Sequence, residues 1–331
     1  METGDINGAM WSIFAYLSIA LEKGRSLPAL EADMAVYHKQ MKDAKFDEAV
    51  LYLEGIWQRV LNLLGSDYST NTTVLTGEVM DRDDVLKQAQ ESNKPLLVAS
   101  VLQNELILLF HYCEYVEAAD LAIAKVDEMC NDAPGVRVSI TTYCYSALSC
   151  FSAYRTTRKR KYLKIAKTLS SKVKSWAHKG NPNLVHYVPL LDAEVAASRG
   201  RRAEAAKYYN SAITAVGRLG MPHEHAIVNE RFGEFLLLLV GDRDEAKYRL
   251  ETATELYREW GAMGKVEQMN SFYLPVWTLP LDISFRHAGG LAIDMSSLHL
   301  DTGAVFGKMS QVSGLDMDDD DEVEDENASV F

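Results

Sequence analysis

The fold is decided by two stretches of sequence, RRAEAAKYYNSAITAVG (201–217) and RDEAKYRLETATELYREW (243–260). Each stretch carries a small, a large and a small residue at positions i, i+4 and i+7: Ala205, Tyr209 and Ala212 in the first, and Ala246, Leu250 and Ala253 in the second. These positions share one face of a helix, where small residues let a neighbouring helix approach and the large residue fills the gap. Repetition of a helical unit at a fixed distance predicts stacked helix hairpins, which form a solenoid.

Helical periodicity continues outward from these stretches over almost all of the chain up to about residue 260. Gly200 and Gly241 stand where each of the last two hairpins turns, and Trp260 ends the second repeat. We therefore predict an all-α fold, a tetratricopeptide-like α-solenoid of antiparallel helix hairpins, over residues 1–273. The polar stretch 66–80 is interpreted as a surface loop. Residues 274–331 are expected to form an irregular linker and a disordered acidic tail.

Charge is distributed unevenly along the chain. The net charge is −13, but nine acidic residues fall between Asp316 and Glu326, so the rest of the chain is close to balanced. In contrast, no acidic residue occurs from Ala133 to Leu191. The basic residues of this stretch predict a candidate interaction patch that consists of Arg155, Arg158, Lys159, Arg160, Lys161, Lys164, Lys167, Lys172 and Lys174.

Three interpretations of this basic stretch (155–174) remain open. It binds an anionic partner such as nucleic acid or lipid head groups, or acidic residues of a neighbouring helix neutralise it, or the acidic tail folds back onto it. Nucleic acid is not favoured, because the flanking sequence lacks interleaved aromatic residues and the chain is acidic overall.

Composition also limits the cellular context. No apolar run reaches 18 residues, so no membrane span is expected. The N-terminal sequence METGDING has no basic region, so we expect no secretory signal. Cysteines occur without a C-x-x-C pair, and we expect reduced, mostly buried thiols in a cytoplasmic protein: Cys113, Cys130, Cys144 and Cys150.

The sequence contains no motif for a nucleotide, a catalytic nucleophile or a metal. His223 and His225 flank Glu224, and we expect them in capping and surface roles. We predict no catalytic, metal-binding or cofactor-binding residue, no cofactor and no small-molecule ligand. The alternative, an enzyme of unknown type, would require carboxyl, histidine or cysteine groups with shifted pKa values clustered in one pocket.

The segment YREWGAMGKVEQM (257–269) resembles the end of a helical-repeat region found in large multidomain signalling proteins. The matching residues are Tyr257, Arg258, Trp260, Gly261, Ala262, Lys265 and Val266. Further segments resemble this region in the same order: GDINGAMWSIFAY (4–16), LEADMAVYHKQMKD (30–43), YLEGIWQRVLNLLG (52–65), residues 161–200, HAIVNERFGEFLL (225–237) and, faintly, residues 300–314. In that family an AAA-type ATPase, often after a serine/threonine kinase domain, precedes the repeats, and a GAF domain and a histidine kinase follow them.

The resemblance implies a helical spacer, standing alone or cut from a longer gene product, without the ATPase, GAF and kinase modules. No catalytic residue of the family is carried over. We therefore expect a non-catalytic scaffold that mediates protein–protein interaction in signal transduction. The expected partners are proteins, including ATPase or kinase signalling modules.

Overall fold

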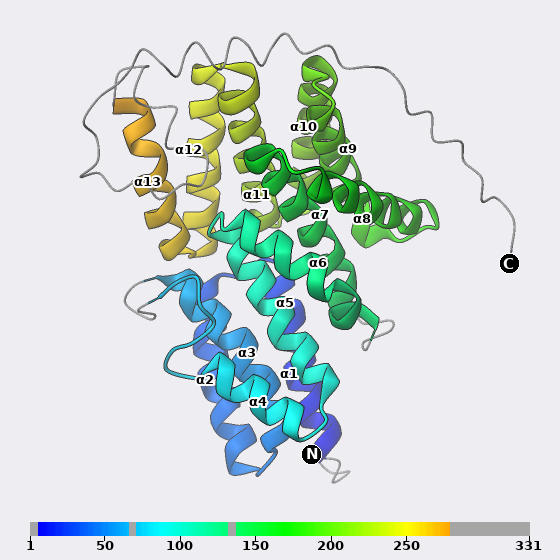
Figure 1. Cartoon of the computed structure of the whole chain (residues 1–331). Coiled ribbons are helices and arrows are strands. Elements are labelled where there is room, and N and C mark those ends of the chain that lie inside the picture. Colours follow the sequence, from blue (N-terminus) through cyan, green and yellow to red (C-terminus); the bar gives the residue numbers. More distant parts are fainter. Residues whose placement is uncertain (1–5, 66–70, 132–136, 279–331) are drawn as a thin grey trace, which may run out of the picture. The chain divides into compact units, whose positions relative to one another are not determined.

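The computed structural model describes residues 6–65, 71–131 and 137–278, and every element within these ranges is helical. The all-α prediction is thus confirmed for this part of the chain (Figure 1). The α-helices are α1 (Ile6–Glu22), α2 (Leu27–Asp43), α3 (Asp47–Leu64), α4 (Arg82–Glu91), α5 (Pro95–His111), α6 (Tyr115–Asn131), α7 (Arg137–Thr157), α8 (Arg160–His178), α9 (Tyr187–Ser198), α10 (Arg202–Gly217), α11 (Pro222–Phe235), α12 (Arg243–Trp260) and α13 (Met263–Thr278). A 3-10 turn (Pro182–Leu184) precedes α9, and a π-helical turn (Leu236–Val240) extends α11.

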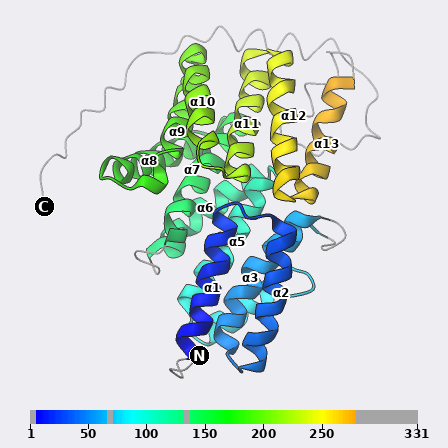
Figure 2. The ribbon, with the colours of Figure 1, turned by 180° about the vertical axis from the view of Figure 1, so that it is seen from behind.

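Most helices that are consecutive in the chain pack beside each other, most extensively α11 with α12, followed by α7 with α8 and α9 with α10 (Figure 2). Gly241 ends the π-helical turn with a φ of 86°, a left-handed conformation that glycine adopts without strain. Gly233 lets α11 and α12 approach closely, because a Cβ atom there would lie 2.6 Å from Cγ of Leu250. The large residue of the second repeat therefore packs directly against the backbone of α11.

The end of the described chain returns to its beginning, where α13 packs against α3. Gly65 and Gly264 meet at this contact, and a Cβ on Gly264 would lie 2.7 Å from Cα of Gly65. Nearby, the hydroxyl of Tyr112 donates a hydrogen bond of 2.6 Å to the carbonyl of Asn62. A solenoid whose units contact only their sequence neighbours does not predict this contact.

The segment between α3 and α5 differs from the predicted surface loop. Its described part, 71–80, is tied to α3, because Nδ2 of Asn62 donates to the carbonyl of Val74 at 2.7 Å. Leu75 and Met80 are buried. The loop then leads into α4, which the sequence analysis did not assign and which is capped by the side chain of Asp81.

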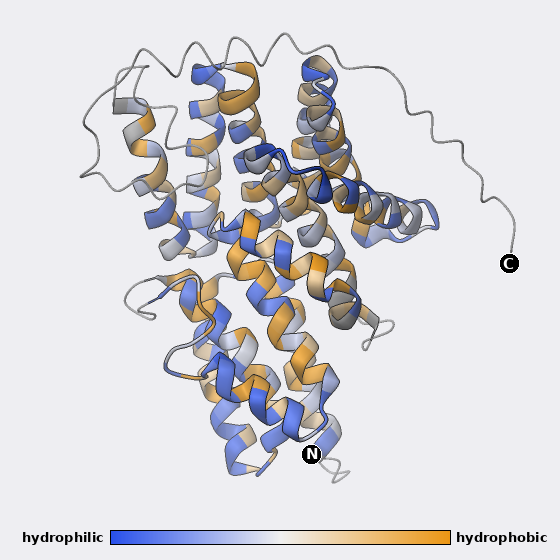
Figure 3. Cartoon of the chain, viewed as in Figure 1, coloured by the Kyte–Doolittle hydropathy of each residue, from blue (hydrophilic) through white to orange (hydrophobic). Residues whose placement is uncertain are grey.

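Hydropathy follows position in the fold, as the contrast between α4, largely hydrophilic, and α5, largely hydrophobic, shows (Figure 3). Across the described helices, none is both long enough and apolar enough to cross a bilayer.

At the C-terminal end, α13 continues past the predicted boundary at 273 to Thr278. The remaining linker and the acidic tail lie outside the described residues.

Candidate functional site

The residues of the repeated pattern lie in the core of the last two hairpins. They are all buried, with at most 2% of their surface exposed: Ala205, Tyr209, Ala212, Ala246, Leu250, Ala253 and Trp260. The ring of Tyr209 stacks on Phe232 of α11, with centroids 5.0 Å apart and ring planes 13° apart. In both repeats the large residue thus packs against α11.

The basic residues of the candidate patch occupy two different environments. Arg155 belongs to α7, and its side chain is only 9% exposed because it turns inward to Glu194. The others lie on or just before α8 and are exposed or half-buried: Arg158, Lys159, Arg160, Lys161, Lys164, Lys167, Lys172 and Lys174. Arg155 is therefore part of the core and not of an exposed surface.

Neighbouring helices supply partners to some lysines of α8. Lys161 pairs with Asp120 of α6 at 2.7 Å, and Lys174 pairs with Asp192 of α9. The hydrogen bond from Lys161 holds the pKa of Asp120 below its ordinary value. Among the described residues, no carboxylate lies within 4 Å of Arg158, Lys159 or Arg160. Neutralisation by neighbouring acids thus applies to part of α8, and its N-terminal end keeps unpaired positive charge.

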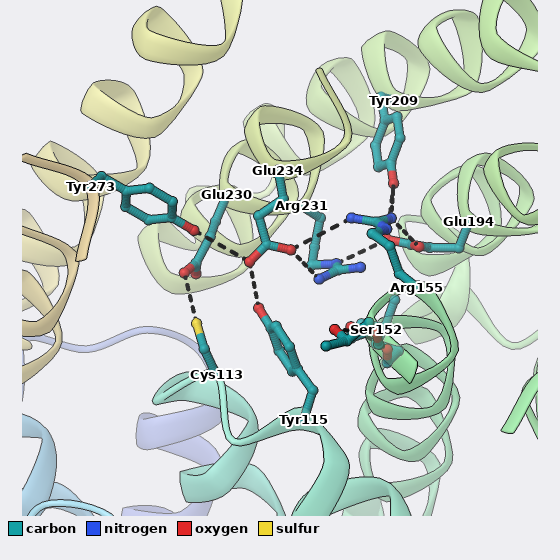
Figure 4. A network of polar contacts seen from close by, with 12 residues as sticks. Cys113, Tyr115, Ser152, Arg155, Glu194, Tyr209, Glu230, Arg231, Glu234 and Tyr273 are labelled. Atoms are coloured by element: carbon teal, nitrogen blue, oxygen red, sulfur yellow. Dashed lines mark hydrogen bonds and ion pairs between the residues drawn. The ribbon is translucent and has the colours of Figure 1, made fainter. Parts of the chain in front are cut away.

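A buried ion network joins α7, α9, α10 and α11 (Figure 4). The carboxylate of Glu194 accepts hydrogen bonds from Arg155 at 2.8 Å, from Nε of Arg231 at 2.9 Å and from the hydroxyl of Tyr209 at 2.9 Å. Arg231 also donates to Glu234, one turn further along α11. Burial opposes ionisation of Glu194, but the two guanidinium groups outweigh it and leave its pKa below the ordinary value.

A second group of charges adjoins this network where α13 meets α11. Nζ of Lys265 lies 2.6 Å from Oε1 of Glu230 and 3.4 Å from Sγ of Cys113, and Tyr257 donates to Glu230 at 2.8 Å. Cys113, Glu230 and Glu234 place their possible ligand atoms within 4.8 Å of one another. The ammonium group of Lys265 already neutralises Glu230, so this cluster does not favour a metal ion.

None of the four cysteines, all in the described part of the chain, forms a disulfide, and three of them are buried. Burial raises the pKa of Cys113 and of Cys150 to about 12 and that of Cys130 to about 11. Because the thiolate is the reactive form, these cysteines are poor nucleophiles at neutral pH.

A cavity of about 270 Å³ is lined by side chains of α1, α3, α5, α7, α9, α11 and α12. Part of its lining is exposed, since Trp11 and Leu96 are 37% and 46% exposed. Other lining residues are covered, since Arg59, His223 and Trp260 are buried. Residues that are far apart in the sequence thus form one concave site, a common arrangement for a ligand pocket.

His223 and Glu224 line this cavity and are buried, so the surface role predicted for His223 is wrong, whereas His225 is half-buried and does not line the cavity. The imidazole of His223 stacks on Trp260 with ring centroids 4.9 Å apart. Burial lowers the pKa of His223 to about 3 and raises that of Glu224 to about 7. Both shifts favour the uncharged form in a poorly hydrated site.

Two further buried histidines line the same cavity. Burial lowers the pKa of His111 to about 3 and that of His186 to about 4, so both rings are neutral at pH 7. Nδ1 of His111 donates to the carbonyl of Ile107 at 2.7 Å, because a carbonyl oxygen can only accept. Its Nε2 then carries a lone pair, and it has no hydrogen-bond partner among the described residues.

The cavity holds the kind of groups that the enzyme alternative requires, buried histidines and a carboxyl group with shifted pKa values. One carboxylate oxygen of Glu224 accepts a hydrogen bond from Tyr187. The other is covered and has no partner among the described residues.

Sequence analysis missed Arg59, which lies on α3 and lines the cavity. A signal was present, because Tyr52, Ile56, Arg59 and Leu63 follow the four–three–four spacing of one helix face and all four line the cavity. A single arginine on an otherwise apolar face marks either a buried ion pair or a ligand site.

None of the protein-family models, curated proteins or solved structures compared with this chain matches it. The resemblance to the repeat region of signalling ATPases and kinases therefore stays a prediction.

Proposed function

We propose that this chain is a non-catalytic helical-repeat module that mediates protein–protein interaction in signal transduction. The hairpins α9–α10 and α11–α12 would be its tetratricopeptide-like units, and an acidic segment of a partner protein would bind at the N-terminal end of α8. One observation carries the proposal: Arg158, Lys159 and Arg160 are exposed together at a helix end that has no acidic residue in its first turn.

This arrangement is electrostatically unfavourable for the isolated chain. The N-terminus of a helix carries partial positive charge, so basic side chains there repel it and each other. No side-chain cap satisfies this end of α8. An acidic segment would supply both the missing negative charge and hydrogen-bond acceptors for the free N–H groups.

The rest of α8 limits where such a partner would bind. Lys161 and Lys174 already pair with acids of neighbouring helices, and Lys172 donates to the hydroxyl of Tyr143 at 2.7 Å. Lys164 and Lys167 have no ion pair among the described residues and extend the free charge toward the middle of the helix. An acidic partner would thus bind across the first half of α8.

The family resemblance supports a signalling role, and it suggests ATPase or kinase modules as partners. The chain also carries an acidic segment of its own, DMDDDDEVEDE (316–326). That segment has the composition that we propose for the partner. It therefore provides a defined peptide probe.

Fluorescence anisotropy with this labelled peptide tests the proposal. We expect the full chain with Arg158→Glu, Lys159→Glu and Arg160→Glu to bind about tenfold more weakly than the wild type, and binding to weaken with salt. The matched control reverses three exposed charges elsewhere, Lys207→Glu, Arg218→Glu and Lys247→Glu, and should bind like the wild type. Equal losses in both variants, or no binding of the peptide, would overturn the proposal.

Duplex DNA and vesicles with anionic lipids serve as competing probes. If either binds more tightly than the peptide and depends on the same three residues, α8 is a general anion-binding surface and the protein-partner proposal is wrong.

A further inference from the structure

Arg59 is the most unusual charged group in the described part of the chain. It is 9% exposed, and no carboxylate of the described residues lies within 4 Å of its guanidinium group, which makes no hydrogen bond there either. Burying a charge without a partner is costly, so such a group is normally paired.

The other buried arginines show what this fold does when an arginine is structural. Arg155 approaches Glu194 at 2.8 Å and Glu234 at 3.5 Å. Arg231 is held by the same two carboxylates. Arg59 lacks this kind of pairing and faces a cavity instead, which points to an anionic group supplied by a ligand.

The remaining lining defines the rest of that ligand. Trp11 and Tyr52 approach each other edge to face with centroids 5.4 Å apart, and Phe14 lies 5.9 Å from Trp11. Ile56 and Leu63 flank Arg59 along the cavity face of α3. Such a wall favours an aromatic or branched apolar body beside the charged group.

Two acidic residues of the cavity restrict the charge of the ligand. Glu22 attracts Arg59 electrostatically but does not form an ion pair with it, and Glu224 accepts a hydrogen bond from the hydroxyl of Tyr187. Because burial raises the pKa of Glu224 to about 7, the negative charge near Arg59 comes mainly from Glu22, which would repel a ligand with two or more negative charges. One carboxylate suits the site best, because a guanidinium group can hold its two oxygens with parallel hydrogen bonds.

We propose that the cavity binds a small monocarboxylic acid with an aromatic or branched apolar body, whose carboxylate pairs with Arg59. The volume of about 270 Å³ lies just below the usual range of sites for drug-sized ligands, which begins at about 300 Å³, so it limits the ligand to a small molecule. This site is independent of the proposed binding surface on α8. It departs from the sequence-based expectation of no small-molecule ligand.

Isothermal titration of the full chain with matched acids and amides tests this site. The probes are indole-3-acetate, phenylacetate and 3-methylbutanoate, each paired with its neutral primary amide. We expect at least one acid to bind, and its amide to bind at least tenfold more weakly. If no acid binds at millimolar concentration, or if acids and amides bind equally, the proposal is wrong.

Variants locate the binding. Arg59→Met should abolish the preference for the acid, whereas Arg202→Met, which removes an exposed arginine on α10, should leave it unchanged. Ser18→Phe places a bulky ring on the half-buried cavity wall of α1 and should weaken acid and amide alike. Retention of the full acid preference in Arg59→Met would overturn the assignment. If that variant does not fold, the acid-to-amide ratio of the wild type and the loss in Ser18→Phe still decide it.

Discussion

The ion network and the cavity both involve α11, yet they treat buried charge in opposite ways. In the network and the adjoining cluster, three cations face three carboxylates: Arg155, Arg231 and Lys265 against Glu194, Glu230 and Glu234. In the cavity, Arg59 has no such partner and buried histidine nitrogens lack hydrogen bonds among the described residues. A balanced network holds helices together, whereas unbalanced polar groups around a cavity suit a binding site.

The strongest test of this difference between the two regions is to remove one arginine from each of them. Arg231→Met leaves the buried negative charges of Glu194 and Glu234 with less positive charge nearby, and should lower the free energy of unfolding by about 3–5 kcal/mol. Arg59→Met removes a charge that has no partner, so we expect it to be neutral or stabilising. Urea unfolding of the two variants measures both effects, and equal losses would show that the regions do not differ in this way.

The pH dependence of the free energy of unfolding tests the buried groups of the cavity. The pKa values of His111, His186 and His223 are lowered from the ordinary 6.5, so the unfolded chain binds more protons and stability falls as pH drops from 6.5 toward 3. The raised pKa of Glu224 acts in the opposite sense, since stability falls as pH rises from 4.5 to about 7. Between pH 6.5 and 5 each histidine should contribute a loss of about 2 kcal/mol.

Urea unfolding of His223→Gln at pH 7 and pH 5 isolates one of these rings. The loss of stability between the two pH values should be about 2 kcal/mol smaller than in the wild type. His178→Gln, at the exposed end of α8, is the control and should follow the wild type. An unchanged pH dependence in His223→Gln would mean that its ring is not held neutral by burial.

A further test concerns the packing of α11, the helix that both regions share, against α12. Gly233→Ala would place a Cβ 2.6 Å from Cγ of Leu250 and 3.3 Å from the carbonyl oxygen of Ala246, and should cost about 1–3 kcal/mol. Gly217→Ala in α10 meets nothing closer than 3.9 Å, and should be neutral or gain up to about 1 kcal/mol. Thermal unfolding of the pair checks this, and the packing argument fails if both respond alike.

Helices and their turns could be predicted from the sequence because apolar spacing and glycine positions are local signals. The short helix α4 was missed, since its sequence RDDVLKQAQE has only a weak apolar stripe and depends on the cap at Asp81. Burial of Glu230 and Arg231 was also missed. Spacing indicates which face of a helix a charged residue occupies, but not whether a distant helix places the opposite charge there.

The π-helical turn Leu236–Val240 has an evolutionary consequence. A turn of this kind has the geometry of an α-helix with one added residue. Here the N–H of Gly241 donates a hydrogen bond of 2.8 Å to the carbonyl of Leu236. The extra residue is absorbed after Glu234, the last charged residue of α11 in the network. A change of one residue in the length of this segment can therefore be tolerated without rotating the charged side chains away from their partners.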